Sequence, residues 1–399
     1  MIANLPELVA PAGSAESLEM ALKFGADAVY LGLGRFNARM KAGNFELSRL
    51  KETAGFIHSK GAKMYVAFNT LIKQSELLES CHGDGGVDNL SAAEMAVQSL
   101  RDGADAIILQ DLGLLKAVKA LEPAAVIHAS TQMGIHNVEG ALAVKVMGVS
   151  RVILSREVPL DDIAEIKRKT GLELEVFVQG ALCVSFSGNC YFSSLVSGYS
   201  GNRGMCMQLC RKKYKALEGG REISNGYLLS PRDLCLAKDI QKLIEAGVDS
   251  FKIEGRMRRP EYVGEAVRVY RKAISGAVGK EDIDALKSVY NRGDYTTGYL
   301  FGADSRTLIE PKLQGHKGLY AGDVIKTGAG GVLTAKIARG VVKGDGFKVL
   351  RDGYEAGSAE AFETQSGGEC RLRYKGNLKP GDCLHITTDI RQIERLNGS

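Results

Sequence analysis

A short motif that recurs in the first 255 residues constrains the fold more than any other feature of this sequence. Each copy has a glycine that closes a helix, a short turn, and then a run of β-branched and other apolar residues. The copies are FGADAVYLGL (24–33), DGADAIILQDL (102–112), MGVSRVILSRE (147–157) and AGVDSFKIEG (246–255). A helix-closing glycine followed by a continuous apolar run is typical of a buried parallel strand. The repeat therefore predicts an α/β fold in which helices and parallel strands alternate.

Further short apolar runs fall between these copies, and amphipathic helical stretches separate most of them. They cover residues 8–10, 64–68, 126–129, 174–178 and 227–229. Units of this number and spacing predict a TIM-like (β/α) barrel. An open doubly wound sheet is built from units that look alike in sequence, so it stays as the alternative.

The domain organisation follows from the length of the chain and from a change in its residue pattern towards the C-terminus. The 399 residues exceed the size at which a single hydrophobic core usually stops growing, so we expect two domains. Towards the C-terminus come short alternating strands broken by Gly-Asp turns, as in VVKGDGFKVL (341–350). We predict a TIM-like barrel over 1–290, a connector over 291–318 and a small antiparallel β-barrel over 319–399.

Charge and hydropathy limit the location and the partners. The N-terminus lacks the basic region, apolar run and cleavage site of a secretory signal, and no long apolar run follows. We therefore expect no membrane span and a cytoplasmic location. The net charge of +5 neither demands nor excludes a nucleic-acid partner. Basic residues gather at 203–221 and 252–259; solvated faces would explain them, but their closeness to the cysteines favours an anionic substrate.

The cysteines carry the strongest chemical pattern. Eight cysteines in a reducing compartment are better explained by metal binding or catalysis than by disulfides. Four of them cluster with the spacing C-x6-C-x15-C-x3-C: Cys183, Cys190, Cys206 and Cys210. Four converging thiolates match either zinc or an iron–sulfur cluster, and spacing alone does not choose between the two.

The surroundings of these cysteines, within the segment 175–214, favour an iron–sulfur cluster. The first pair is separated by a longer loop than a zinc knuckle has, lysines and arginines flank the site, and apolar side chains would form a sheath around it. The expected sheath consists of Phe186, Tyr191, Phe192 and Leu195. Cys235 stays open as a replacement ligand. The remaining three cysteines lack cysteine partners nearby and are interpreted as unrelated to the site: Cys81, Cys370 and Cys383.

Polar residues follow many of the predicted strands. They include Gln110, Gln132, Glu157, Gln179 and Glu254. In a (β/α) barrel these ends meet on the C-terminal face, where active sites are built, although helix caps would explain any single one as well. The glycines at 32 and 34, near Arg39, suit a cradle for a carboxylate or phosphate, but a barrel loop also needs glycines for geometry alone.

Five stretches together resemble the collagenase-like peptidase family U-32 over nearly the whole chain. They are ELVAPAGSAESLEMALKFGADAVYLG (7–32), EVFVQGALCVSFSGNC (175–190), SGNRGMCMQLCRKKY (200–214), LLSPRDLC (228–235) and FKIEGRMRRPEYV (251–263). The better understood members of that family hydroxylate RNA bases at C5, in ribosomal RNA cytidine or tRNA uridine. A related pair hydroxylates a quinone precursor without oxygen.

The resemblance implies a [4Fe-4S] cluster on Cys183, Cys190, Cys206 and Cys210, with prephenate as the source of the hydroxyl group. These four positions coincide with those of the ribosomal RNA type, which also has the HASTQ stretch found at 128–132. The quinone type places one ligand elsewhere. The implied partner is RNA, either tRNA or rRNA.

The first functional hypothesis is therefore an RNA C5-hydroxylase that takes the target base from a loop or by flipping. The candidates for lining the catalytic site are His128, Gln132, Glu157, Glu254 and Arg256. The candidates for holding RNA phosphates are Arg203, Arg211, Lys212 and Lys213. A Glu or a His is suited to moving the C5 proton.

Two other classes of function compete with this one. A peptidase would match the family name, but HExxH and GxSxG are absent from the sequence, and thiols bound to a cluster are not free to attack. A Cys nucleophile with His128 or His136 is conceivable. In a partner-dependent role, the cluster would be structural and the β-domain would dock RNA or a protein subunit. A homodimer is left open.

Overall fold

The computed structural model describes residues 5–78, 90–302 and 304–398. Its internal contacts divide the chain into two compact units. Unit 1 comprises Met1–Leu209, Leu234–Ala277 and Thr297–Ala303, and unit 2 comprises Cys210–Asp233, Val278–Thr296 and Asp304–Ser399. The ranges predicted from the sequence are contiguous, whereas each unit is assembled from three segments of the chain.

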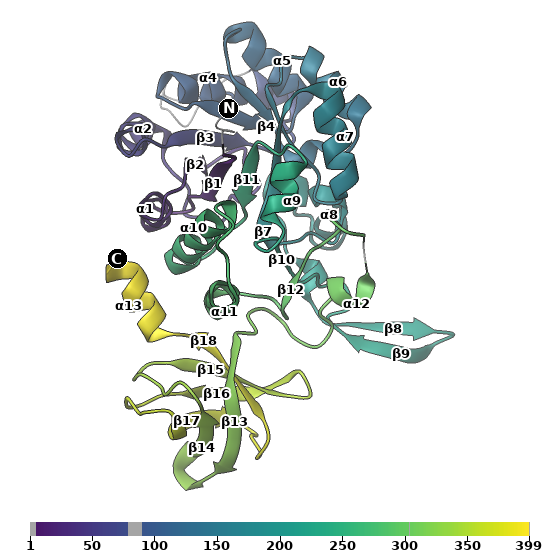
Figure 1. The fold of residues 1–399 in the computed structure, drawn as a ribbon. Coiled ribbons are helices and arrows are strands. Elements are labelled where there is room, and N and C mark those ends of the chain that lie inside the picture. Colours follow the sequence, from purple (N-terminus) through teal and green to yellow (C-terminus); the bar gives the residue numbers. More distant parts are fainter. Residues whose placement is uncertain (1–4, 79–89, 303, 399) are drawn as a thin grey trace. The chain divides into compact units, whose positions relative to one another are not determined.

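In the described part of unit 1, eight parallel strands close into a barrel (Figure 1). They pair in the order β11-β1-β2-β3-β4-β5-β6-β7, and β7 pairs with β11 to complete the ring. The strands are β1 (Glu7–Pro11), β2 (Ala28–Gly32), β3 (Lys63–Phe68), β4 (Ala106–Leu109), β5 (Ile127–Ala129), β6 (Arg151–Ile153), β7 (Glu173–Ala181) and β11 (Ser250–Ile253). The short strand β10 (Asp233–Cys235) lies beside β7. The predicted TIM-like barrel is confirmed, and the closure of the ring rules out the open sheet.

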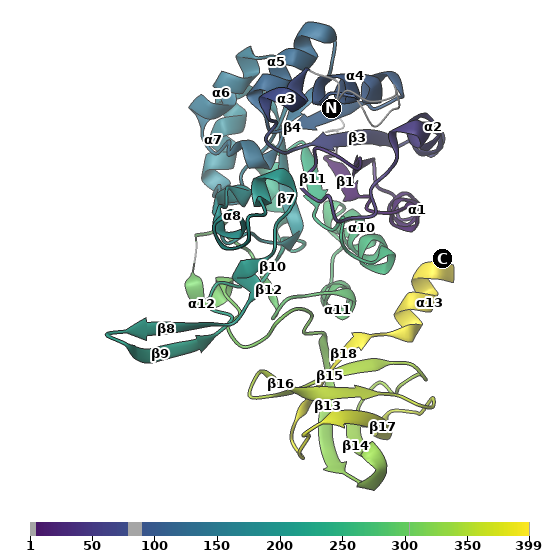
Figure 2. The ribbon, with the colours of Figure 1, turned by 180° about the vertical axis from the view of Figure 1, so that it is seen from behind.

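Helices alternate with the strands and lie around them (Figures 1 and 2). The longer ones are α1 (Ala15–Lys23), α2 (Leu50–Ser59), α4 (Ala92–Arg101), α5 (Leu112–Leu121), α6 (Val138–Val146), α7 (Leu160–Thr170) and α10 (Pro260–Ile274). The short ones are α3 (Gln74–Leu77), α8 (Phe192–Ser197) and α9 (Ile240–Glu245). Several begin at a capping side chain that accepts a backbone N–H, as Ser14, Ser91 and Asn137 do.

The recurring motif builds the entry to its strands in a common way. The helix-closing glycine has a left-handed backbone, with φ of 91° at Gly25. In three of the four copies an aspartate two residues later accepts a hydrogen bond from an amide near the start of a neighbouring strand, whereas the copy at 147–157 has Ser150 at this position. Asp27 accepts from Leu8 N over 2.7 Å, and Asp249 accepts from Leu174 N over 2.8 Å. The motif therefore fixes the register between neighbouring strands as well as the end of each helix.

The barrel interior is charged near the N-terminal ends of the strands and mostly apolar further along. Arg151 Nη1 donates to Glu7 over 2.5 Å and to Glu175 over 3.2 Å. Lys252 Nζ donates to Glu175 Oε1 over 2.6 Å. The next layer includes Val9, Tyr30, Ala67, Ile108 and Ile153. Lys252, which belongs to a basic run in the sequence, is therefore a buried ion-pair partner and not part of a solvated face.

Unit 2 contains a closed barrel of antiparallel strands in the order β13-β14-β17-β16-β15-β18 (Figure 1). The strands are β13 (Leu319–Thr327), β14 (Val332–Ile337), β15 (Gly346–Arg351), β16 (Tyr354–Glu360), β17 (Gly368–Gly376) and β18 (Cys383–Thr388). Its core includes Val324, Leu333, Phe347, Leu372 and Leu384. The predicted small antiparallel β-barrel is confirmed.

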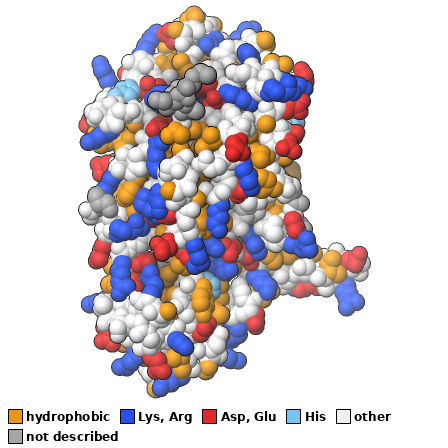
Figure 3. Space-filling model, viewed as in Figure 1, with side chains coloured by type: hydrophobic (Ala, Val, Ile, Leu, Met, Phe, Trp, Pro, Cys, Tyr) orange, Lys and Arg blue, Asp and Glu red, His pale blue; other side chains and the backbone are white. Residues whose placement is uncertain are grey.

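The rest of unit 2 consists of a hairpin, helices and connecting chain. These elements are β8 (Tyr214–Glu218), β9 (Arg221–Gly226), α11 (Lys280–Val289), β12 (Tyr295–Thr296), α12 (Ser305–Leu308) and α13 (Ile390–Gly398). Helix α11 packs against β13 and β18. No described helix of the chain is both long and apolar enough to cross a membrane. In the space-filling view, basic and acidic side chains are interspersed over the visible face (Figure 3).

Candidate functional site

Charged side chains gather where the barrel strands of unit 1 end. Arg39 lies in the loop after β2, Arg156 follows β6, and Glu254 and Arg256 follow β11. Arg39 Nη2 donates to Glu254 Oε1 over 3.1 Å, and the charges of both act on Arg156. We call Arg39, Arg156, Glu254 and Arg256 the mouth cluster.

Asn37 joins two parts of this cluster that are far apart in the sequence. Its Oδ1 accepts from Arg256 Nη2 over 2.7 Å and from Arg39 N over 2.9 Å. Its Nδ2 donates to Leu33 O over 2.5 Å. A Cβ at Gly32 would lie 1.9 Å from Arg256 Nη1, so glycine is needed at position 32 to leave room for this guanidinium.

The mouth cluster carries more positive charge than its single carboxylate compensates. Burial alone would raise the pKa of Glu254, but Arg39 and Arg156 outweigh burial and hold this pKa below its usual value. Burial lowers the pKa of Arg156, and it lowers the pKa of Arg256 to about 10. A lowered arginine pKa means that the protein compensates the charge poorly. An additional anion at this place would therefore be bound favourably.

Several polar atoms at the same end of the barrel are buried and have no protein partner in the described structure. Two of them belong to the mouth cluster: Arg156 Nε and Arg256 Nη1. Others belong to residues that follow or end the strands: Gln110 Oε1, Ser155 Oγ and Gln179 Nε2. Buried polar groups are nearly always hydrogen-bonded, so such a gathering points to a ligand or to ordered water.

The cysteine segment, residues 183–210, leaves β7 and is fastened to neighbouring loops. Glu157 accepts from Ser187 N over 2.9 Å and from Ser187 Oγ over 2.6 Å. These bonds hold Ser187 in a left-handed conformation, with φ of 42°, which is costly for a residue other than glycine. Further along, Arg203 Nη2 donates to Glu76 Oε1 over 2.7 Å. Glu157 is a catalytic candidate from the sequence, and Arg203 is a candidate for binding RNA phosphates. In the structure, both side chains hold the cysteine segment in place.

The thiols have surroundings that suit iron–sulfur ligands. None of the described cysteines forms a disulfide, and Cys81 lies outside the described residues. Cys190 Sγ accepts from Phe192 N, and Cys206 Sγ accepts from Gln208 N, each over 3.4 Å. Amide donors to sulfur are a means by which proteins tune the thiolate ligands of a cluster. The donor set and its hydrogen bonds thus fit the chemistry of a cluster.

The same thiols are not gathered around one point. Among the described residues, no group of three or more His, Cys, Asp or Glu side chains is arranged so that it could hold a metal ion. Three of the cysteines belong to unit 1, whereas Cys210 belongs to unit 2. The alternative ligand Cys235 lies on β10, with Tyr270 Oη 3.8 Å from its Sγ. The assignment of Cys183, Cys190, Cys206 and Cys210 as ligands therefore stays a prediction.

Comparison with known proteins decides the family. The family described as Peptidase family U32 matches residues 13–310, which is most of the chain. An uncharacterized protease of Methanocaldococcus jannaschii is 38% identical over 315 residues, which cover 74% of this chain and 73% of that protein. The chain belongs to peptidase family U32. The resemblance expected from the sequence motifs is confirmed.

Other U32 relatives carry names from RNA modification. The tRNA hydroxylation protein P1 of Bacillus subtilis is 34% identical over 321 residues, which cover 76% of this chain and 72% of that protein. The 23S rRNA 5-hydroxycytidine synthase of Escherichia coli is 34% identical over 412 aligned residues. That alignment covers 98% of this chain and 59% of the longer relative. Its match thus includes the small β-barrel of unit 2, which lies beyond the family match.

The structure separates the remaining catalytic candidates of this U32 protein. His128, on β5, is 3% exposed, and its ring meets the edge of Tyr65 with the ring centres 4.8 Å apart. Burial lowers the pKa of His128 well below its usual value, so the imidazole is neutral. Gln132 lies in the turn η3 (Thr131–Met133), where a Cβ at Gly188 would be 3.5 Å from its Cγ. The structure thus brings Gln132 to the cysteine segment and leaves His128 inside the barrel.

The predicted phosphate-binding residues fall into two groups. Arg211 is buried in unit 2, and its Nη1 donates to Ser230 Oγ over 2.9 Å, so its guanidinium is already engaged. Lys212 and Lys213 are exposed in the same unit. Their role in binding phosphate stays a prediction.

The apolar residues of the cysteine segment do not enclose the cysteines as the sequence suggested. Phe186 is 43% exposed, Tyr191 67% and Leu195 84%. The predicted sheath is therefore wrong for these residues in this structure. They instead present aromatic and aliphatic surface to solvent beside the mouth of the barrel.

Sequence reasoning found two of the four residues of the mouth cluster of this U32 protein, Glu254 and Arg256. It gave Arg39 only a weak role, and it did not choose Arg156 or the adjoining Asn37 for the site. The usable signal was the pair of glycines beside Arg39, because Gly32 makes room for the guanidinium of Arg256.

Proposed function

We propose that this protein hydroxylates C5 of a pyrimidine base in RNA, and that prephenate, a dicarboxylate, supplies the hydroxyl group. The observation that carries the proposal is the mouth cluster. Its three arginines surround one carboxylate, and two of its buried guanidinium nitrogens have no protein partner. A small dianion would supply both the missing charge and the missing hydrogen-bond acceptors.

The comparisons support RNA as the other substrate. Two relatives at 34% identity are named for hydroxylation of tRNA and of 23S rRNA. The match to the ribosomal RNA enzyme extends over 98% of this chain, so we propose a ribosomal RNA cytidine ahead of a tRNA uridine. The exposed aromatic side chains of the cysteine segment offer surfaces on which an unpaired base would stack.

The residues of the mouth take separate roles in this proposal. Arg156 and Arg256 bind the carboxylates of the donor through their unpaired nitrogens. Arg39 keeps Glu254 ionised, and an ionised Glu254 is able to accept the proton that leaves C5 when the hydroxyl group replaces it. The donor carbon that gives up the hydroxyl group takes the two electrons of the broken C5–H bond and a proton, so that one C–H and one C–OH bond are exchanged between base and donor. A neutral His128 could also accept a proton, but it lies among the interior side chains of the barrel. Glu254 is therefore the stronger candidate for the base.

The cysteine segment is proposed to hold a [4Fe-4S] cluster on Cys183, Cys190, Cys206 and Cys210. When bound, such a cluster would activate or orient the oxygen donor. The backbone amides that donate to Cys190 and Cys206 would stabilise the thiolate form of these two ligands.

Nucleoside analysis tests the proposal directly. A strain that lacks the gene is grown without air, and its rRNA and tRNA are digested and analysed by mass spectrometry. We expect one 5-hydroxypyrimidine to disappear and to return with the wild-type gene or with Cys383→Ala, a cysteine variant in the small β-barrel. Cys183→Ala and Glu254→Gln should not restore it. An unchanged nucleoside profile in the deletion strain would overturn the proposal.

A peptidase is the second candidate, because the relative at 38% identity is named a protease. The same purified protein is therefore incubated with gelatin before and after its iron is removed. Cleavage that requires Cys183 but is indifferent to iron would favour the peptidase. Cleavage by neither preparation, together with loss of the modified nucleoside, would favour the hydroxylase.

A further inference from the structure

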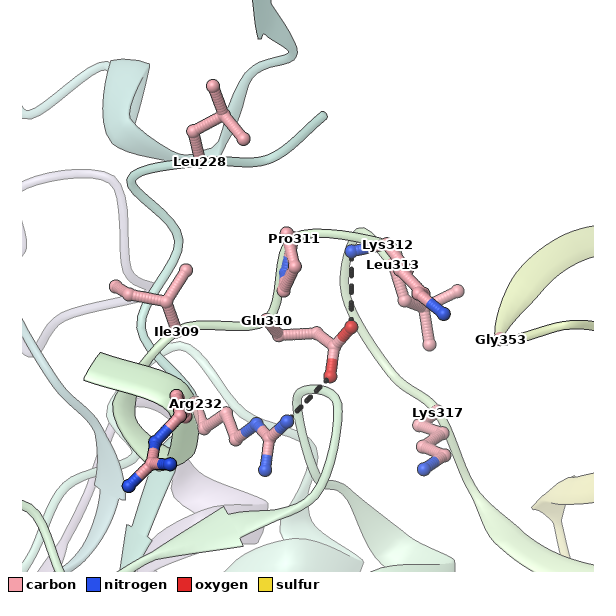
Figure 4. A pocket seen from close by; sticks show the side chains of 10 residues that line it. Leu228, Arg232, Ile309, Glu310, Pro311, Lys312, Leu313, Lys317 and Gly353 are labelled. Carbon is pink, nitrogen blue, oxygen red and sulfur yellow. Dashed lines mark hydrogen bonds and ion pairs between the residues drawn. The ribbon is translucent and has the colours of Figure 1, made fainter. Parts of the chain in front are cut away.

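A pocket in unit 2 has no part in the mouth cluster or the cysteine segment. Its volume is about 620 Å³, which lies within the range of ligand-binding sites, about 300 to 1,000 Å³. It lies between the chain that follows the hairpin, at Leu228 and Arg232, the stretch Ile309–Leu313 with Lys317, and Gly353 of the small β-barrel (Figure 4).

The pocket is strongly basic. Four cationic side chains line it: Arg232, Arg306, Lys312 and Lys317. Among the described lining residues, Glu310 alone is acidic. Glu310 is already engaged, because it pairs with Arg232 over 3.4 Å and accepts from Lys312 N over 3.1 Å. It therefore orients one arginine and the backbone. Arg306 pairs with Asp304 over 2.9 Å, which leaves Lys312 and Lys317 without a carboxylate partner among the described lining residues.

Donors remain available inside the pocket. Arg232 Nε is buried and has no hydrogen-bond partner in the described structure. Figure 4 shows Arg232 and Lys317 extending toward the space beside Glu310, with no bond drawn to Lys317 from the other residues shown. Lys312 Nζ is held at the rim, where it donates to Asp352 O over 3.0 Å. Arg232 and Lys317 lie on opposite sides of this space, and Lys312 is fixed at its rim. Three cations in this arrangement suit an anion with several oxygens.

Apolar side chains complete the lining. Leu228, Ile309 and Leu313 offer surface against which a ribose or a base would pack. We propose that this pocket binds the sugar-phosphate backbone of RNA, with one phosphate between Arg232 and Lys317. The inference rests on the proposed function, since an RNA whose base is modified in unit 1 must also be held by its backbone. Arg203 and Arg211 are bound within the protein, whereas Lys317 and the Nε of Arg232 remain available to bind a phosphate.

Binding of a fluorescent twelve-nucleotide pyrimidine RNA to the full-length protein tests the inference. The pocket variant is Lys312→Ala with Lys317→Ala, and the matched control is Lys326→Ala with Lys336→Ala, two exposed lysines on β13 and β14. We expect the pocket variant to bind about tenfold more weakly and the control to bind like the wild type. The slope of log affinity against log salt should become shallower by about 0.7 in the pocket variant, because about 0.7 is lost for each phosphate contact on single-stranded RNA and the pocket is proposed to hold one phosphate.

Competitors identify the source of the anion. Uridine monophosphate, inorganic phosphate and an oligoglutamate peptide are each tested against the labelled RNA. Weak competition by all three supports an extended RNA site. The inference would be overturned if the pocket bound the mononucleotide but not RNA, or if oligoglutamate bound more tightly than RNA. Equal RNA binding by the pocket and control variants would overturn it as well.

Folding is checked by the unfolding transition of every variant. If the double variant does not fold, Lys317→Glu alone replaces it, because Lys317 makes none of the bonds that hold Lys312 at the rim. The assay measures RNA binding and not hydroxylation. A failed nucleoside test would therefore leave this result interpretable, and equal binding by the two variants would leave the proposed hydroxylase untouched.

Discussion

Replacing Arg256 by Gln should separate the binding of the anion from the stability of the barrel. Arg256 is 4% exposed, its Nη2 donates to Asn37 Oδ1, and its Nη1 has no protein partner in the described structure. Burial lowers its pKa to about 10, so the free protein holds this charge at a cost. Losing one charge-assisted hydrogen bond to a carboxylate should weaken prephenate binding by about 1.5 to 3 kcal/mol, which is about tenfold to a hundredfold in Kd.

Two measurements check this prediction. Calorimetric titration with prephenate gives the Kd of the wild type, of Arg256→Gln and of Arg168→Gln, a control that removes an exposed arginine of α7. Urea unfolding without ligand should show Arg256→Gln to be no less stable than the wild type, and only the wild type and the control should gain stability with prephenate. If Arg256→Gln bound prephenate as tightly as the control did, an anion site at the mouth cluster would be refuted.

Three further predictions concern the barrel, the glycine loop and the cysteine segment. Glu175→Gln removes the carboxylate that faces Lys252, so urea unfolding at pH 7 should show a loss of about 3 to 5 kcal/mol. Part of this loss should be recovered as pH rises toward 10, because burial lowers the folded-state pKa of the unpaired lysine below its unfolded value, and the folded state then binds fewer protons. Gly32→Ala places a Cβ 1.9 Å from a guanidinium nitrogen of the mouth cluster and should weaken prephenate binding in the titration, whereas Gly34→Ala, with open space around it, should not. Anaerobic reconstitution with iron and sulfide should protect residues 183–210 from limited proteolysis, and equal digestion of both forms would count against a cluster held by this segment.

Much of the architecture follows from local patterns in the sequence. The glycines that close helices and the apolar runs after them act over about ten residues, so they are legible without tertiary information. The same holds for the alternating strands and Gly-Asp turns of the small β-barrel. The cysteine segment is also recognisable, because four thiols within twenty-eight residues stand out in any fold.

The role of each charged residue was decided by the tertiary structure. Arg256 and Asn37 are 219 positions apart and meet only because the strands that precede them are brought to one end of a closed barrel. Lys252 and Arg211 look like surface cations in the sequence, yet one is paired with a buried glutamate and the other is bonded inside unit 2. A charge can be buried only where a partner or a ligand compensates it. Periodicity encodes burial along one element, whereas the partners come from elements far away in the chain, so the sequence by itself determined the scaffold and the tertiary structure decided the site.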